Sequence, residues 1–68
     1  MADERITDYP ADVQPIVNQI EARGVKVLVR RMVNGDYSAR ARFDDGRNDV
    51  TTYGSTMHNA VSLLAIAF

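Results

Sequence analysis

Residues 25–43 read VKVLVRRMVNGDYSARARF, and this stretch decides the predicted fold. Residues 25–33 are rich in β-branched side chains, which predicts a strand. Asn34-Gly35 is the strongest short signal for a hairpin turn. Residues 37–43 predict the returning strand, because apolar and polar side chains alternate along them. The centre of the chain is therefore expected to be a β-hairpin.

The length of the turn decides which side chains share a face of this hairpin. A two-residue turn at Asn34-Gly35 places the valines among the arginines, with Val29 opposite Arg40 and Val27 opposite Arg42. A three-residue loop over 34–36 separates an apolar face from a basic face, with the pairs Val33–Tyr37, Val29–Ala41 and Val27–Phe43. A one-residue bulge at Arg30-Arg31 also restores this separation below the bulge. We expect one of these last two arrangements.

A helix is predicted on each side of the hairpin. Residues 12–23 carry apolar side chains at helical spacing (Val13, Ile16, Val17 and Ile20), with Asp12 as N-cap, Pro15 in the first turn and Gly24 at the end. Residues 49–53 predict a third, shorter strand. Gly54 ends it, and Ser55 or Thr56 caps a final helix. The apolar side of that helix comprises Met57, Ala60, Val61, Leu64, Ala65 and Phe68.

The predicted fold class is α+β, in the order α-β-β-β-α. We expect a three-stranded antiparallel sheet with both helices packed on one face, which gives two layers. Residues 12–68 form this single domain, and residues 1–11 are expected to be a flexible or extended N-terminal arm.

Size and composition restrict the possible functions. A chain of 68 residues buries only about 60% of its unfolded surface, so extra support is expected for a domain this small. There is no Cys and one His, which excludes disulfides and makes a structural zinc site improbable. No apolar run approaches the roughly 20 residues of a membrane span. We expect a cytoplasmic protein that does not contact membranes, needs no cofactor and gains support by self-association.

Charge is divided unevenly along the chain. Residues 23–47 hold seven of the eight basic residues but only three of the nine acidic ones. The basic patch expected on the outer face of the hairpin consists of Lys26, Arg30, Arg40 and Arg42, with Leu28 and Met32 among them, and Arg47 extends it from the next turn. Arginine matches both carboxylates and phosphates. The alternative is a solvated sheet face whose charges discourage aggregation.

Nucleic acid is the less favoured ligand of this patch. The sequence pI is near 5.6, whereas nucleic-acid-binding domains are more often basic overall. Tyr37 and Phe43 are expected on the core side, and Tyr53 can join them, so bases would find few aromatic side chains for stacking.

A second surface is predicted on the final helix, where Leu63, Ile66 and Ala67 point away from its core side. Contiguous exposed apolar residues usually mark an interface, so these residues are expected to mediate self-association, most simply as a homodimer. The alternative is a frayed last turn at the end of the chain.

No motif in the sequence predicts catalysis. His58 stands alone, without a Cys or an acidic neighbour on its helix, and the glycines form no phosphate-binding loop. Ser55, Thr56 and Thr52 are better explained as cap and strand residues than as nucleophiles. We therefore expect a protein that is not an enzyme and binds no metal.

The order α-β-β-β-α, with Gly54-Ser55-Thr56 opening the last helix, resembles the double-stranded-RNA-binding domain. Residues 53–60, YGSTMHNA, also resemble the strand-to-helix junction of HicB-type antitoxins. RNA-binding members grip phosphates with a lysine cluster at the start of the last helix. Here that turn is Met57-His58-Asn59, so the resemblance implies a similar scaffold used for protein contacts.

These features together predict a small binding protein, an inhibitor or regulator of the type encoded by phages and mobile elements. It is expected to self-associate and to bind a partner protein with an acidic surface through the arginine-rich sheet face. The alternative is a nucleic-acid-binding module that uses the same basic hairpin.

Overall fold

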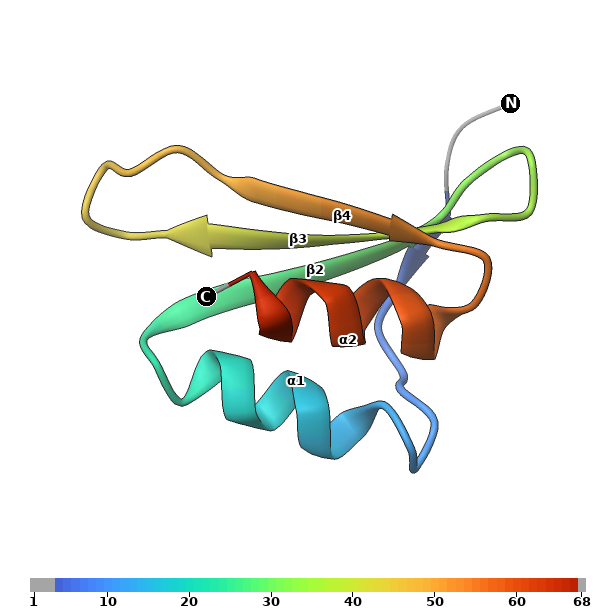
Figure 1. Ribbon diagram of the computed structural model, residues 1–68, viewed down its shortest axis with the longest axis horizontal. Coiled ribbons are helices and arrows are strands. Elements are labelled where there is room, and N and C mark those ends of the chain that lie inside the picture. The colour runs from blue at the N-terminus through green and yellow to red at the C-terminus, as the bar shows by residue number, and fades with distance from the viewer. Residues whose placement is uncertain (1–3, 68) are drawn as a thin grey trace.

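A computed structural model describes residues 4–67, which form two layers: a four-stranded antiparallel sheet and two helices (Figure 1). The elements follow in the order β1 (Glu4–Ile6), α1 (Gln14–Glu21), β2 (Val25–Arg31), β3 (Tyr37–Phe43), β4 (Val50–Gly54) and α2 (Met57–Ile66). Neighbours in the sheet follow chain order, β1-β2-β3-β4. The α+β class and the antiparallel sheet are as predicted.

The predicted number of strands is wrong, because β1 adds a fourth strand at the edge of the sheet. It lies within residues 1–11, the stretch described above as a flexible or extended arm. Ile6 pairs with Val29 of β2, and Glu4 pairs with Arg31. Three residues with one apolar side chain show no alternation, so nothing local predicts this strand. Its partner lies more than twenty residues further along the chain.

The hairpin of β2 and β3 separates its faces as predicted, but its register differs by two residues from the expected three-residue loop. Val27 lies opposite Ala41 and Val29 opposite Ala39, and no bulge interrupts the pairing. The expected partners, Ala41 for Val29 and Phe43 for Val27, are therefore wrong. A shift of two leaves every side chain on its original face, because the side-chain period of a strand is two.

The loop itself explains the register. It is three residues long, but it comprises Val33-Asn34-Gly35 instead of residues 34–36. Gly35 N–H donates to the Met32 carbonyl at 2.9 Å, and Met32 N–H donates to the Asp36 carbonyl at 2.7 Å. Gly35 has φ 91°, which suits a residue without a Cβ. This is a turn followed by a left-handed glycine, a common three-residue hairpin loop.

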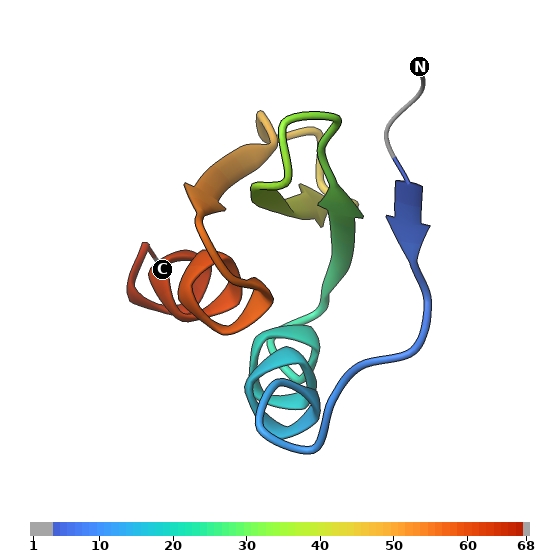
Figure 2. The ribbon, with the colours of Figure 1, turned by 90° about the vertical axis from the view of Figure 1, so that its right-hand side faces the viewer.

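Both helices cover the same face of the sheet, as predicted (Figure 2). α1 packs against β2, and α2 packs against β3 and β4. Between the layers lies a wholly apolar core, comprising Val13, Val17, Ile20, Val25, Val27, Val29, Ala39, Ala41, Ala60, Val61 and Leu64. No charged or polar residue among those described is buried.

The starts of the two helices differ in how well the sequence predicts them. α2 begins after Thr56, whose side chain accepts a hydrogen bond from Asn59 N–H at 3.1 Å, as predicted for one of the two candidate caps. The predicted Asp12 cap of α1 is wrong. α1 begins after Val13 without a side-chain cap, because the Pro10 carbonyl accepts from two of the free N–H groups. Phe68 lies outside the described residues.

Candidate functional site

The outer face of the sheet is the candidate site, because neither helix covers it (Figure 2). Side chains alternate along each strand, so the register defines which residues share this face. They are Arg5 of β1, Lys26, Leu28 and Arg30 of β2, Ser38, Arg40 and Arg42 of β3, and Thr51 and Tyr53 of β4, with Met32 just beyond β2. The structure thus gathers six of the seven predicted partner-binding residues on one surface.

A shallow hollow of about 210 Å³ lies in this face, across the three longer strands. Its lining comprises Leu28, Arg30, Met32, Ser38, Arg40, Thr51 and Tyr53. Two arginines, two hydroxyls, two apolar side chains and one aromatic ring therefore meet at one place. The combination suits a ligand that presents an anionic group next to an apolar one.

The cations of this face differ in whether a carboxylate already neutralises them. Arg40 Nε donates to Asp49 Oδ2 at 2.8 Å, and the Asp49 side chain is only 25% exposed. Within residues 4–67, no ion pair involves Lys26, Arg30 or Arg42, and all three are exposed. Free positive charge is thus concentrated on β2 and β3, and Arg40 is oriented by Asp49.

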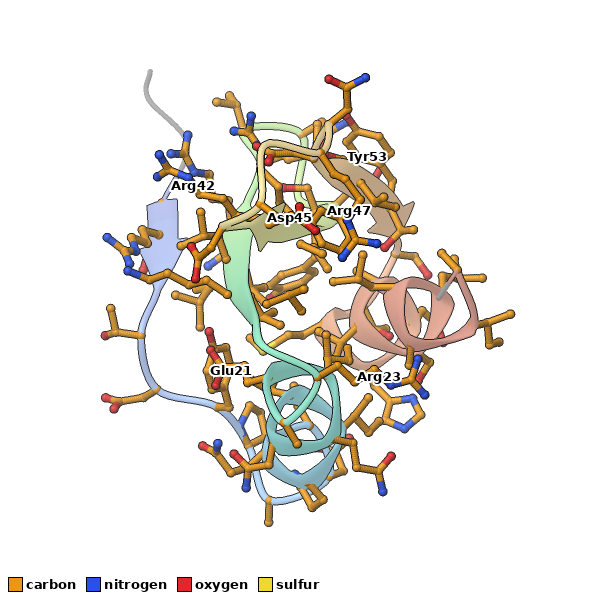
Figure 3. All side chains as sticks on the ribbon, turned by 90° about the vertical axis from the view of Figure 1, so that its left-hand side faces the viewer. Glu21, Arg23, Arg42, Asp45, Arg47 and Tyr53 are labelled. Carbon is orange, nitrogen blue, oxygen red and sulfur yellow. The ribbon has the colours of Figure 1, made fainter. Side chains whose placement is uncertain are left out.

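Arg47, the seventh predicted residue, does not join this surface (Figure 3). Its Nε lies 2.8 Å from Asp45 Oδ2, and its guanidinium lies 4.3 Å from the centre of the Phe43 ring. Phe43 packs against the core, so this contact holds Arg47 at the helix-facing side of the sheet. The hydrogen bond from Arg47 also lowers the pKa of Asp45 below its ordinary value. Arg47 therefore makes contacts within the β3–β4 loop and at its start.

Four further residues of this face do not belong to the predicted patch: Arg5, Ser38, Thr51 and Tyr53. Tyr53, whose side the sequence left open, is 60% exposed, because Val50 and Thr52 occupy the inward positions of β4. The sequence could have predicted the exposure of Tyr53, because side chains alternate along a strand and an inward Val50 places Tyr53, three residues later, on the outer face. The inward position of the polar Thr52 side chain is stabilised by a hydrogen bond, which its Oγ1 donates to the Ala60 carbonyl at 2.7 Å. Arg5 had no such signal, since β1 itself was not predictable.

The predicted self-association residues lie together on α2, away from the basic face. Leu63 is 47% exposed and Ile66 is 78% exposed, and Ala67 follows them as an exposed C-cap. They are separate from the buried side of the helix, formed by Ala60, Val61 and Leu64.

The remaining titratable residues form no cluster typical of catalysis or metal binding. No group of three or more His, Asp or Glu side chains that could hold a metal occurs within residues 4–67. His58 lies on the exposed surface of α2, where its Nδ1 is 3.5 Å from Ser62 Oγ. None of the described helices is both long and apolar enough to cross a membrane.

Comparisons of the chain with protein-family models, with curated proteins and with solved structures found no match. The resemblance to double-stranded-RNA-binding domains and HicB-type antitoxins therefore stays a prediction. The candidate function depends on the geometry of the chain itself.

Proposed function

We propose that this chain is a binding protein without enzymatic activity, an inhibitor or regulator of the kind that phages and mobile elements encode. Its outer sheet face binds an acidic surface of a partner protein, and the chain self-associates through α2. One observation carries this proposal: the uncovered face of the sheet holds cations that lack carboxylate partners, around a hollow that also contains apolar side chains.

The charges on the face favour a ligand with carboxylates. Arg30, Arg42 and Lys26 lie on adjacent strands, with Lys26 directly opposite Arg42. Like charges opposite each other destabilise a sheet, so their joint presence on one face favours a role in binding. An acidic surface would relieve this repulsion, and each arginine offers a fork that matches a carboxylate.

The apolar residues of the hollow favour a protein surface over a polyanion. Leu28 and Met32 are half-buried among the arginines, where they would contact the side-chain stems of a partner. Interfaces between proteins typically enrich Met, Arg and aromatic residues in this way. The overall acidity of the chain, with a pI near 5.6, disfavours a general affinity for nucleic acid.

A matched pair of double variants tests the face. Arg30→Glu with Arg42→Glu reverses two charges of the outer face, whereas Arg31→Glu with Arg47→Glu makes the same charge change elsewhere. With a fluorescent glutamate-rich peptide as probe, we expect the first variant to lose binding by at least about tenfold, roughly 1.4 kcal/mol. We expect the second variant to bind nearly as the wild type. Equal losses would reject the face as a site, provided circular dichroism shows both variants folded.

One observation favours a second candidate function, binding of single-stranded nucleic acid. Tyr53 is exposed on the same face as the arginines, opposite Ser38, which in turn lies opposite Arg30. An exposed aromatic ring beside cations can stack on a base, and each such stack is worth about 1–3 kcal/mol.

A single-stranded oligonucleotide with as many negative charges as the peptide separates the two functions. The protein-binding proposal predicts that the peptide binds at least as tightly, and that Tyr53→Ala barely changes oligonucleotide affinity. A tighter oligonucleotide complex that weakens with Tyr53→Ala and falls steeply with salt would favour nucleic acid, because bound phosphates release counterions.

A further inference from the structure

The two edges of the sheet differ in how they are protected. β1 forms one edge and β4 forms the other. β1 is short and carries Glu4 and Arg5, and both features discourage pairing with another chain. β4 has the sequence VTTYG, without a charge, a proline or a bulge. Its residue types favour strands, so β4 is an edge suited to pairing.

The hydrogen-bond pattern shows which groups of β4 are free. Met32 N–H bonds to the Asp36 carbonyl, so Met32 and Asp36 form a hydrogen-bonded pair at the end of the hairpin. In an antiparallel ladder such pairs alternate. The alternation directs the backbone of Ala39 towards Thr52 of β4, and it leaves the N–H and C=O groups of Thr51 and Tyr53 pointing away from the sheet.

The side of β2 that faces β1 supports the same hydrogen-bond alternation. The same alternation turns the backbone of Val27 away from β3, beyond the end of the short β1. There Val27 N–H donates to Glu21 Oε2 at 3.4 Å. The outward group on that side thus has a side-chain partner, whereas no hydrogen bond to the backbone N–H or C=O of Thr51 or Tyr53 is found outside the sheet ladder.

The strand at this edge and the helix beneath it, β4 and α2, contain no Asp, Glu, Lys or Arg, because Asp49 is the last charged residue of the chain. In a chain with 25% charged residues, two copies can therefore bring β4 and α2 together without placing charged side chains of these elements against each other. Three of the four large hydrophobic residues that are exposed within residues 4–67 belong to these two elements: Tyr53, Leu63 and Ile66.

The exposed side of α2 is adjacent to the free edge of β4. Ala60 contacts β4 through the hydrogen bond of its carbonyl with Thr52, and its backbone N lies close to Gly54. Leu63 and Ala67 follow Ala60 at helical spacing, so they continue the same flank of α2. Figure 2 shows α2 beneath β4 at the side of the molecule away from β1. Strand edge and apolar helix flank therefore form one surface.

We propose that this surface pairs with its own copy, so that two β4 strands run antiparallel about a twofold axis at Thr52. Thr51 of one copy then lies opposite Tyr53 of the other, and each such pair exchanges both N–H···O bonds. Such a symmetric register satisfies all the outward groups of both residues, and β4 and α2 bring no Asp, Glu, Lys or Arg into the contact from either copy. Beneath the joined strands, Leu63 and Ile66 of the two α2 helices pack together.

The dimer joins the two sheets into one, with both pairs of helices on the same side. The two basic faces then form one continuous surface, with the Tyr53 side chains near its centre. This inference deepens the self-association included in the proposed function. It is independent of which ligand the basic face binds.

The test is the molar mass in solution of single variants, measured by light scattering. Proline at Thr51 removes an outward N–H that the sheet does not use, and edge strands tolerate it there. We expect a dimer for the wild type and a monomer for Thr51→Pro. Arg5→Pro is the matched control at the opposite edge, since Arg5 also has an outward N–H, and it should remain a dimer. Leu63→Asp is expected to be a monomer without touching the sheet.

Each outcome supports or overturns the proposed β4 interface. If Thr51→Pro fails to fold by circular dichroism, Leu63→Asp decides alone. A monomeric wild type, or dimers of both folded variants, would overturn the β4 interface, and so would a folded monomer of Arg5→Pro. Peptide binding by the wild type keeps the two proposals distinguishable. A monomeric wild type that binds the glutamate-rich peptide overturns the β4 interface alone, and a dimeric wild type that does not bind the peptide overturns the basic face alone.

Discussion

At the scale of single residues, Gly54 allows the closest approach between the sheet and a helix. A Cβ at this position would lie 2.6 Å from Ala60 N and 2.9 Å from Asn59 Cβ. Since the Ala60 contact is with backbone, the strand or the helix would have to move. The glycine that the sequence suggests as a strand breaker also lets α2 lie directly against β4.

Gly54→Ala is therefore expected to destabilise the fold, by about 1–3 kcal/mol as for other overpacked sites. Chemical denaturation with urea measures this. Thr51→Ala is the control in the same strand, because Thr51 is exposed and should change stability far less. Equal stability of Gly54→Ala and the wild type would contradict the close packing described here.

Tyr9 gives the structure a pH dependence at the alkaline end. Burial, and then the charge of Glu21, raise the pKa of Tyr9 above its ordinary value of 10.0, while Arg5 lowers it. The folded state therefore holds the Tyr9 proton more tightly than the unfolded state. This contribution is fully present below pH 10 and is lost as the pH rises through the folded pKa.

We expect Tyr9→Phe to reduce the loss of stability above pH 10 relative to the wild type. Near pH 7 the two proteins should have similar stability, because within residues 4–67 the Tyr9 hydroxyl makes no hydrogen bond. Denaturation curves at both pH values measure the difference. If the stability of Tyr9→Phe falls above pH 10 as steeply as that of the wild type, groups other than Tyr9 cause the alkaline pH dependence.

At the scale of elements, α2 depends on its N-cap residue, for which the sequence predicts either Ser55 or Thr56. Thr56 accepts a hydrogen bond from Asn59 N–H, whereas no such bond involves Ser55. Thr56→Ala should therefore cost about 0.5–2 kcal/mol, and Ser55→Ala should cost much less. Thermal or chemical unfolding of the two variants compares them directly. The reverse order would show that the helix starts one residue earlier.

The hairpin shows which features of an element can be predicted from local sequence patterns. The strand over 37–43 was predicted with its observed bounds, because seven alternating side chains and a turn signal agree locally. The face of each hairpin residue was predicted too, since parity survives a register shift of two. The loop residues were wrong because three-residue loops over 33–35 and over 34–36 separate the two faces equally well, and only the pairing of Met32 with Asp36 selects between them.

Features that depend on distant partners were not predictable. β1 exists because Ile6 finds Val29, and its own three residues carry no pattern. The side of Tyr53 was not assigned from the sequence, because the inward position of its neighbour Thr52 depends on a hydrogen bond to the Ala60 carbonyl of α2. Arg47 was assigned to the basic patch wrongly for a different reason, because its contacts with Asp45 and Phe43, which are near it in sequence, hold it away from the outer face.

At the scale of the whole molecule, the charged side chains are unevenly distributed over the surface. The outer sheet face is basic, β4 and α2 contain no Asp, Glu, Lys or Arg, and the acidic residues within residues 4–67 lie on β1, around α1 and in the loops that join β2, β3 and β4. A nearly neutral chain with a net charge of −1 thus combines a basic sheet face with a strand and a helix that lack these residues. The proposed dimer uses the backbone edge of β4 and the exposed flank of α2, whereas the proposed partner contact uses the side chains of the outer sheet face, which Thr51 and Tyr53 also join.

The most direct test of the central claim is a map of amide chemical shifts while a glutamate-rich peptide is added to the ¹⁵N-labelled protein. The account predicts that the largest changes occur on the outer face, at Leu28, Arg30, Ser38 and Arg42, and that α1 changes little. Changes centred on α1 or on the β3–β4 loop, or no changes at all, would contradict the assignment of the sheet face as the binding surface.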